Sequence, residues 1–286
     1  MCSPSYQHFL ITRFNAPLVE LDGRLPDHDW LVHRFALFDE FCFPSVCAQT
    51  NNAFVWLVFF DEKTPKEFRH RIQNYRELPA FTPCFVEYLD QYVLQRVITE
   101  HRNGSRWVIS SRLDNDDAIC CRFIERVQDE FRPEHLRFLN FRYGYYWHAD
   151  RIYRMEDMSS PFVSLIEEGQ RVTSAMSYDH TAIRKTGPVF QIEDIPGYLQ
   201  VIHDRNLANR LPRSAWRVPR SFLSELFPLP VLRGRDNQFE IWLDWCDSFL
   251  RTCVRSVLPS RVRRLILLRR IGSTGAASPT EQEEKL

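Results

Sequence analysis

Short apolar runs alternate with amphipathic stretches through the first half of the chain. Four runs predict strands, at 8–14, 53–61, 81–89 and 106–114. Between and after them, apolar residues at helical spacing predict helices at 29–49 (as far as Pro44), 64–78, 90–102 and 117–131. Because strands and helices alternate at this spacing, we predict an α/β fold. Its mixed sheet would be mostly parallel in the N-terminal half, with helices on both faces.

The second half of the chain has a less regular pattern. The stretch 137–155 predicts a hairpin that turns near Gly144 or Asp150. A further strand is predicted at 162–168, and a helix at 177–187. We expect antiparallel strands and loops that extend the same sheet.

The C-terminal part changes in composition. We predict one domain over 1–235, an amphipathic basic helical segment over 236–270, and a disordered tail over 271–286. Residues 251–270 contain seven arginines and no acidic residue. Such a segment could lie on an anionic membrane surface, or it could close the core with its arginines toward solvent.

Charge and cysteine content narrow the class of protein. The 286 residues carry 37 Lys+Arg and 37 Asp+Glu, so the basic excess typical of nucleic-acid binders is absent and we expect no nucleic-acid partner. We find no apolar run long enough to span a membrane and no signal-peptide pattern. The eight cysteines form no CxxC motif, which favours reduced thiols in a cytoplasmic protein.

An acidic segment follows the fourth predicted strand. Asp114, Asn115, Asp116 and Asp117 lie at its carboxyl end, where parallel sheets bind their ligands. Three carboxylates in four positions repel one another unless a cation lies between them, and Mg²⁺ or Mn²⁺ uses one or two carboxylates together with substrate phosphates. Arg112 could meet a further phosphate or hold a carboxylate. Alternatively, these acids are solvated and cap the helix that follows.

Four stretches together resemble a known family. The first strand ends in "ITRFN", and "VWLVFFD", "SSRLDNDDAI" and "LQVIHDRNLANR" follow later. Over roughly residues 7–235 the chain resembles the rhamnosyltransferase family of bacterial glycosyltransferases. That family is assigned the GT-A type of fold, in which a DxD motif binds metal and sugar nucleotide. The resemblance implies a nucleotide-binding half over 1–131 and an acceptor half over 132–235.

The resemblance also implies roles for individual residues. Mn²⁺ or Mg²⁺ would be held by three side chains, Asp116, Asp114 and His203. Contacts to the nucleotide-sugar would come from Thr12, Arg13, Asn15, Arg112, Asp114 and Asp117. Asn115 departs from the all-acidic version of the motif and is expected to point away from the metal. Thr12 and Arg13 could instead simply end a strand, and His203 could be an ordinary hydrogen-bonded histidine.

The reaction that the resemblance implies needs one general base. An inverting transfer requires a carboxylate that deprotonates the acceptor hydroxyl. The candidates are Asp179, Glu193 and Asp194, and the 191–197 stretch is better placed because it precedes the His203 segment. Glu193 and Asp194 could equally be loop or cap residues.

Three functions remain open. The first is transfer of a sugar, with rhamnose suggested by the family name, from a dTDP- or UDP-sugar to a saccharide or lipid-linked acceptor. A lipid-linked acceptor would place the protein at the inner face of the membrane. The second is a metal-dependent phosphodiesterase or nuclease, and the third is a non-catalytic sugar-binding protein that keeps the fold.

Overall fold

The computed structural model describes residues 6–18, 27–203, 211–212, 215–234 and 236–246. The chain separates into two compact units, Met1–Asp236 and Asn237–Leu286. In the second unit the described residues are helical from 238 to 246. Most of the predicted basic segment, and all of the predicted tail, lie outside the described residues. Within the described part of the chain, no helix has both the length and the apolar character needed to cross a bilayer.

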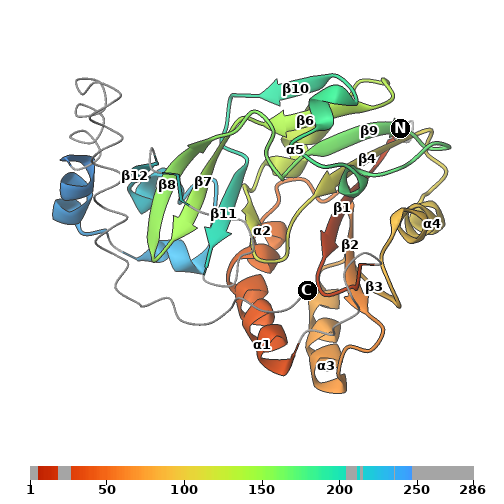
Figure 1. Ribbon diagram of the computed structural model, residues 1–286, viewed down its shortest axis with the longest axis horizontal. Coiled ribbons are helices and arrows are strands. Elements are labelled where there is room, and N and C mark those ends of the chain that lie inside the picture. Colours follow the sequence, from red (N-terminus) through yellow and green to blue (C-terminus); the bar gives the residue numbers. More distant parts are fainter. Residues whose placement is uncertain (1–5, 19–26, 204–210, 213–214, 235, 247–286) are drawn as a thin grey trace, which may run out of the picture. The chain divides into compact units, whose positions relative to one another are not determined.

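Four parallel strands form one side of a seven-stranded sheet (Figure 1). In spatial order they are β4 (Trp107–Arg112), β1 (Tyr6–Arg13), β2 (Val55–Asp61) and β3 (Phe81–Val86). The residues of β2 are almost all buried, as a near-continuous apolar run in a sheet covered on both faces requires. All four carboxyl ends therefore lie along one edge of this sheet.

Three more strands make the sheet mixed. The strand β9 (Ser164–Glu168) runs antiparallel to β4, and β6 (Arg137–Phe141) runs antiparallel to β9. At the edge, β10 (Val189–Ile192) pairs in parallel with β6. The predicted α/β fold class, with a mixed sheet that is mostly parallel in its N-terminal half and helices on both faces, is confirmed.

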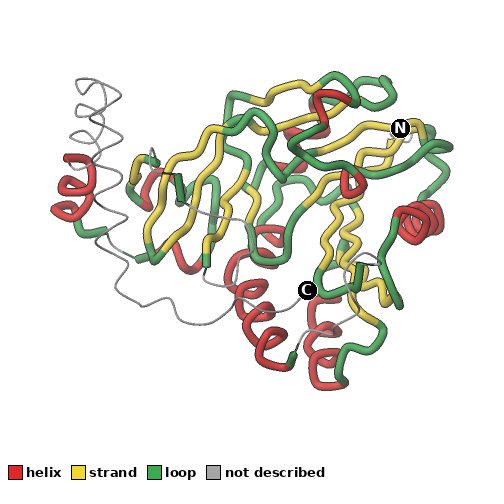
Figure 2. Tube along the Cα trace, in the orientation of Figure 1, coloured by secondary structure: helices red, strands yellow, loops and turns green. Residues whose placement is uncertain are grey.

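A second sheet holds much of the chain after residue 142. Its five strands, in spatial order, are β12 (Trp216–Val218), β8 (Arg151–Glu156), β7 (Tyr143–His148), β11 (Tyr198–Ile202) and β5 (Ala118–Ile119). Figure 1 labels the first four of them, and strands are yellow in Figure 2. The prediction that these residues only extend the first sheet is therefore wrong. The chain passes from one sheet to the other at Arg142, which lies between β6 and β7.

The predicted hairpin is confirmed as β7–β8, and it turns at Ala149 and Asp150. Both residues have positive φ, 47° and 61°, as a tight hairpin turn with the right twist demands. The alternative turn at Gly144 is wrong, because Gly144 lies inside β7. There the ring of Tyr198 occupies the space that a Cβ atom would need.

Helices cover both faces of the first sheet. On one face lie α1 (His28–Leu37), α2 (Phe43–Cys47), α3 (Lys66–Asn74) and α5 (Phe123–Asp129), and on the other lies α4 (Gln91–His101) (Figure 1). A π-helical turn at Phe38–Cys42 joins α1 to α2. The helix was expected to end at Pro44 but runs through it. Pro44 lies in the first turn of α2, directly after the π-helical turn, where the regular α-helical bonding is already interrupted because the Phe43 N–H bonds to the carbonyl of Phe38.

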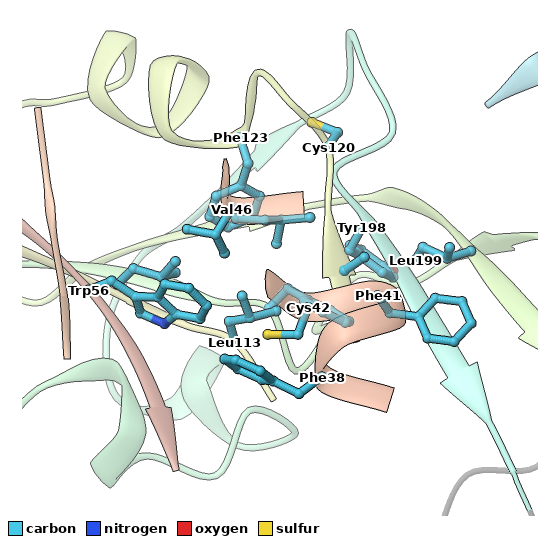
Figure 3. Close-up of a cluster of buried hydrophobic side chains, with 14 of the residues drawn as sticks. Phe38, Phe41, Cys42, Val46, Trp56, Leu113, Cys120, Phe123, Tyr198 and Leu199 are labelled. Atoms are coloured by element: carbon cyan, nitrogen blue, oxygen red, sulfur yellow. The ribbon is translucent and has the colours of Figure 1, made fainter. Parts of the chain in front are cut away.

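A cluster of buried side chains ties the two sheets together. In Figure 3, Phe38 and Cys42 from the π-helical turn lie beside Leu113, which follows β4, whereas the ring of Phe41 points the other way. The same cluster contains Tyr198, which begins β11. The segment after β4 and the strand β11 therefore rest on one shared core.

Two predicted helices are shorter than expected. The helix predicted at 117–131 begins only at Phe123, because Ala118 and Ile119 pair with β11 as strand β5. The stretch predicted as a helix at 177–187 contains only the 3₁₀ turn Ile183–Lys185 and the end of another, Ala175–Ser177. The Asp179 carboxylate accepts bonds from the backbone and side chain of Thr181, a local turn that competes with helix formation.

Candidate active site

The acidic segment lies at the carboxyl edge of β4, and most of it is buried. Asn115, Asp116 and Asp117 are 5%, 6% and 2% exposed, so they are not solvated surface acids. They do not cap a helix either, because α5 begins at Phe123 and its N-cap, Arg122, makes no side-chain cap bond. The simpler interpretation of the segment, solvated acids capping a helix, is therefore wrong.

The negative charge of Asp116 is balanced by side chains from two distant elements. Its Oδ2 lies 2.6 Å from Nη1 of Arg34 on α1 and 3.0 Å from Nε2 of His203, directly after β11. Burial by itself would raise the pKa of Asp116. The hydrogen bond from His203 and the charge of Arg34 outweigh burial, so the pKa of Asp116 is lowered. A buried, ionised carboxylate therefore stands at the strand end.

The neighbours of Asp116 hold the segment in place. The side-chain amide of Asn115 donates to the carbonyl of Phe14 at 3.0 Å, and its oxygen accepts from Arg34 at 3.1 Å. Asp117 accepts a 2.7 Å bond from the backbone N–H of Val201 in β11. Burial, with the charges of Asp116 and Asp114 adding to it, raises the pKa of Asp117 well above its usual range. Asp117 therefore joins the segment after β4 to the second sheet.

Asp114 is the most exposed acid of the segment and is paired with Arg112. The Nη2 of Arg112 lies 3.1 Å from Asp114 Oδ2, and the charge of Asp114 is the main reason why the pKa of Arg112 is raised. Burial lowers the pKa of nearby Arg13, against the opposing effect of Asp114. Arg13, Arg34 and Arg112 thus place positive charge around the acids, which suits an anionic ligand.

Thr12 and Asn15 use their side chains within the protein. Thr12 is fully buried, and its hydroxyl accepts from the indole nitrogen of Trp56 at 3.0 Å. Asn15 donates to the Thr64 hydroxyl at 3.1 Å and accepts from the backbone N–H of Asp61 at 3.2 Å. Thr12 thereby links β1 to β2, and Asn15 fixes the segments that follow these two strands.

Asp61 is a site residue that the sequence reasoning missed. It ends β2 at the same sheet edge and is 1% exposed. Its Oδ1 accepts from the backbone N–H of Lys63 at 2.7 Å, whereas Oδ2 is buried without a hydrogen-bond partner in the described structure. The signal was present, because the apolar run 53–61 ends in this acid.

The residues present fit a small divalent cation. Among the described residues there is no group of three or more His, Cys, Asp or Glu side chains placed to hold a metal. Asp116 Oδ2 and His203 Nε2 are 3.0 Å apart. Two octahedral ligands at right angles, with bonds of about 2.1 Å, are about 3.0 Å apart as well. Mg²⁺ and Mn²⁺ commonly take one or two protein ligands and complete their shell with phosphate oxygens and water.

The three candidate bases lie in different surroundings. Glu193 pairs with Arg142 at 2.8 Å, and Asp194 pairs with Arg126 on α5 at 2.9 Å. Asp179 has no arginine partner within ion-pair distance in the described structure. It lies close enough to Arg112 for each to shift the pKa of the other. The structure therefore brings Asp179, rather than the 191–197 stretch, toward the acidic segment.

Buried acids and arginines at the carboxyl edge of a parallel sheet define the class as an α/β protein with a candidate site for an anionic ligand. Residues 12–214 match the family model described as "Putative rhamnosyl transferase". The chain belongs to this family, and the predicted resemblance is confirmed. A search of curated proteins gave no match.

Three solved structures show distant similarity. S. aureus TarS is 12% identical, with a TM-score of 0.42, and the match covers 68% of this chain and 37% of TarS. TarS 1-349 in complex with UDP is 13% identical, with a TM-score of 0.43, and the match covers 68% of this chain and 60% of that one. The inositol-1-phosphate CTP transferase from T. maritima is 12% identical, with a TM-score of 0.34 and coverage of 81% and 98%. The chain thus spans less than two thirds of either TarS chain.

Proposed function

We propose that this protein transfers a sugar from a dTDP- or UDP-sugar to a hydroxyl group of a saccharide or lipid-linked acceptor, with inversion at the anomeric carbon. Rhamnose is the sugar suggested by the name of the family to which the chain belongs. One observation carries the proposal. Asp116 is an ionised, buried carboxylate beside His203 at the sheet edge where such folds bind nucleotides.

In this proposal Asp116 and His203 hold Mn²⁺ or Mg²⁺, with Asp114 close by. When bound, the cation supplies Lewis-acid stabilisation of the leaving diphosphate. Arg13 and Arg112 add fixed positive charge where negative charge develops on the phosphate oxygens. Asp117, whose pKa is raised chiefly by burial, holds a hydroxyl of the donor sugar in this proposal.

Asp61 gives the proposed nucleotide site a further polar group. Its Oδ2, which has no hydrogen-bond partner in the described structure, can accept a hydrogen bond from a ligand. Suitable donors are the ring N–H of uracil or thymine and a ribose hydroxyl. A buried acceptor without a partner is costly, so a ligand that supplies the missing donor gains affinity. This suits either a UDP- or a dTDP-linked donor.

Asp179 is the proposed general base. Its Oδ1 accepts two bonds from Thr181, which fix its orientation and lower the pKa of the carboxyl group. It is therefore ionised at neutral pH and its side chain is 65% exposed, so an acceptor hydroxyl can reach it. Asp179 would take the hydroxyl proton as the acceptor oxygen attacks the anomeric carbon.

We also propose that the arginine-rich segment 251–270 contacts an anionic membrane surface on its cytoplasmic side, where lipid-linked acceptors occur. The support is its composition, seven arginines and no acid. The segment lies outside the described residues. Co-sedimentation of the full chain with anionic but not neutral vesicles is the expected result, and equal binding to both would contradict it.

The test of the proposed function is calorimetric binding of UDP-sugars and dTDP-sugars to the full chain, with and without Mn²⁺. We expect one nucleotide-sugar to bind in a Mn²⁺-dependent manner. With an acceptor, we expect sugar transfer to fall by about 10³-fold in D116N, because the variant loses the central carboxylate. Chelation of the metal should have a similar effect.

Two other outcomes would replace the proposal. Hydrolysis of a phosphodiester without sugar transfer would indicate the phosphodiesterase or nuclease alternative, which needs a two-metal ligand set that the described residues do not form. Unchanged sugar binding in D116N, with no transfer by either protein, would indicate a non-catalytic sugar-binding protein.

A further inference from the structure

Arg34 is the residue nearest to the charge of Asp116, although 82 positions separate them in the sequence. It lies in the last turn of α1, and its side chain is 14% exposed. Its Nη1 is shared between Asp116 Oδ2 at 2.6 Å and Asn115 Oδ1 at 3.1 Å. The guanidinium also lies 5.1 Å from the centre of the Trp30 ring, one turn earlier in α1. The side chain is thus held at the acidic segment by three groups.

The contacts of Arg34 conflict with direct metal coordination at Asp116. Oδ2 of Asp116 receives Arg34 and His203 together, so both of its lone pairs are engaged. A cation that binds through this oxygen must displace a donor. His203 can move its ring proton to Nδ1 and offer the Nε2 lone pair to the same cation, whereas the guanidinium of Arg34 has no lone pair to offer and can only repel it. Arg34 is therefore the group that has to leave.

The same contacts explain why Arg34 is present. A buried carboxylate without a counter-charge is strongly destabilising, so Asp116 needs a cation even when no metal is bound. Arg34 also has an unsatisfied hydrogen-bond donor, because its Nε is buried without a hydrogen-bond partner in the described structure. A guanidinium has a planar fork of donors that matches two phosphate oxygens.

We infer that Arg34 is an exchangeable counter-ion. It pairs with Asp116 in the metal-free protein, and it transfers its guanidinium to the donor's diphosphate when a divalent cation takes that carboxylate oxygen. Its bond to Asn115 lets the side chain pivot while one N–H remains satisfied. This inference rests on the proposed function, and it adds a residue that neither the acidic motif nor the family match assigns.

The exchange makes metal binding and diphosphate binding cooperative. When Mn²⁺ binds alone, it must displace Arg34 and leave that residue without a partner, which lowers the affinity of the protein for Mn²⁺. A bound diphosphate supplies that partner, so each ligand strengthens the other by the same factor.

The first measurement is the affinity of Mn²⁺ alone for the full chain, by calorimetry or by the electron paramagnetic resonance signal of free Mn²⁺. We expect R34Q to bind Mn²⁺ more tightly than the wild type. R13Q is the matched control, because Arg13 brings the same charge near Asp114 and Arg34 and has no ion pair with a carboxylate in the described structure. An equal gain in R13Q would reduce the effect to general charge and overturn the exchange.

The second measurement is the affinity of UDP and dTDP at saturating Mn²⁺. We expect R34Q to weaken both by about tenfold, the loss of one charge-assisted hydrogen bond, and to weaken UMP less. The increase in Mn²⁺ affinity caused by UDP should shrink in R34Q by the same factor. Unchanged UDP affinity in R34Q would overturn the inference.

R34K covers the case in which R34Q does not fold. Lysine keeps the charge that competes with Mn²⁺ but has no fork for two phosphate oxygens. We therefore expect near wild-type Mn²⁺ affinity and weakened UDP binding, and wild-type UDP binding would contradict the inference. If the wild type itself binds neither Mn²⁺ nor a nucleoside diphosphate, the proposed function fails instead.

Discussion

Two pairs of adjacent acids follow strands of the same sheet and have opposite surroundings. Asp116 and Asp117 come after β4 and are 6% and 2% exposed. Glu193 and Asp194 come after β10, with side chains that are 51% and 53% exposed. In the sequence both pairs look alike, a short apolar run that ends in acids.

The two pairs differ in the partners that their carboxylates need for the fold to be stable. Buried carboxylates require partners, and the first pair receives Arg34 from α1, His203 from the end of β11 and a backbone N–H from Val201. The second pair needs no such support. It forms surface ion pairs with Arg142 and Arg126, which typically contribute little to stability. Acids that are held at such cost are the better candidates for chemistry.

The difference between the buried and the exposed acids is tested most strongly by replacing the candidate bases one at a time. We expect D179N to lower kcat by about 10²-fold or more, since the amide cannot accept the acceptor's proton. KM for the nucleotide-sugar should change little, because Asp179 faces the acceptor in this proposal. Steady-state transfer assays with one donor and one acceptor measure both parameters.

The matched controls are E193Q and D194N, which remove carboxylates of the exposed pair. Both should retain transfer within a few-fold of the wild type, because their partners Arg142 and Arg126 have no contact with the acidic segment in the described structure. A loss in E193Q or D194N as large as that expected of D179N would move the base to the 191–197 stretch.

The next prediction concerns His8, a buried histidine, and its effect on the stability of the fold. His8 in β1 is 1% exposed, and its Nε2 lies 2.8 Å from the Ser111 hydroxyl of β4. Gln128 lies against its other ring nitrogen at 3.3 Å. Both partners are neutral, and burial lowers the pKa of His8 to about 3. The histidine is therefore neutral in the folded protein throughout the usual pH range.

His8 should make the protein acid-sensitive. The unfolded chain protonates this residue below its ordinary pKa of about 6.5, while the folded chain does not until about pH 3. Stability from this group is thus full above pH 6.5 and falls as the pH drops toward 3. Between pH 7.5 and 4.5 we expect a loss of about 2.7 kcal/mol that H8Q does not show. Urea denaturation of both proteins at the two pH values measures it, and equal losses would contradict the pKa shift.

The parallel core and the location of the acidic segment could be predicted because both are local patterns. A continuous apolar run such as 53–61 predicts a buried strand, and an acid directly after it must lie at the carboxyl edge. Asp114 and Asp116 followed from this rule. Asp61 obeys the same rule and was overlooked, because it stands alone rather than in a cluster.

The remaining features depend on contacts between distant residues. Nothing near Arg34 in the sequence indicates that it crosses to residue 116, because the pairing arises from how α1 packs on the sheet. The strand β5 could not be predicted for a similar reason. Its two residues, Ala118 and Ile119, suit a helix start equally well, and only the partner strand β11 decides between the two.

The smallest expected effect is on the stability of the fold when an acid of the exposed pair, Asp194, is replaced. Asp194 forms two hydrogen bonds to Arg126, at 2.9 and 3.2 Å, and Arg126 also pairs with Asp129 and Glu130. Because the carboxylate is about half exposed and Arg126 keeps its other partners, D194N should lower the free energy of unfolding by less than about 1 kcal/mol. The loss should shrink further in high salt, which screens surface charges. Chemical denaturation at low and high salt measures both values. A loss of several kcal/mol that salt does not reduce would mean that the exposed acids are as deeply built into the fold as Asp116, and the contrast between the two pairs would fail.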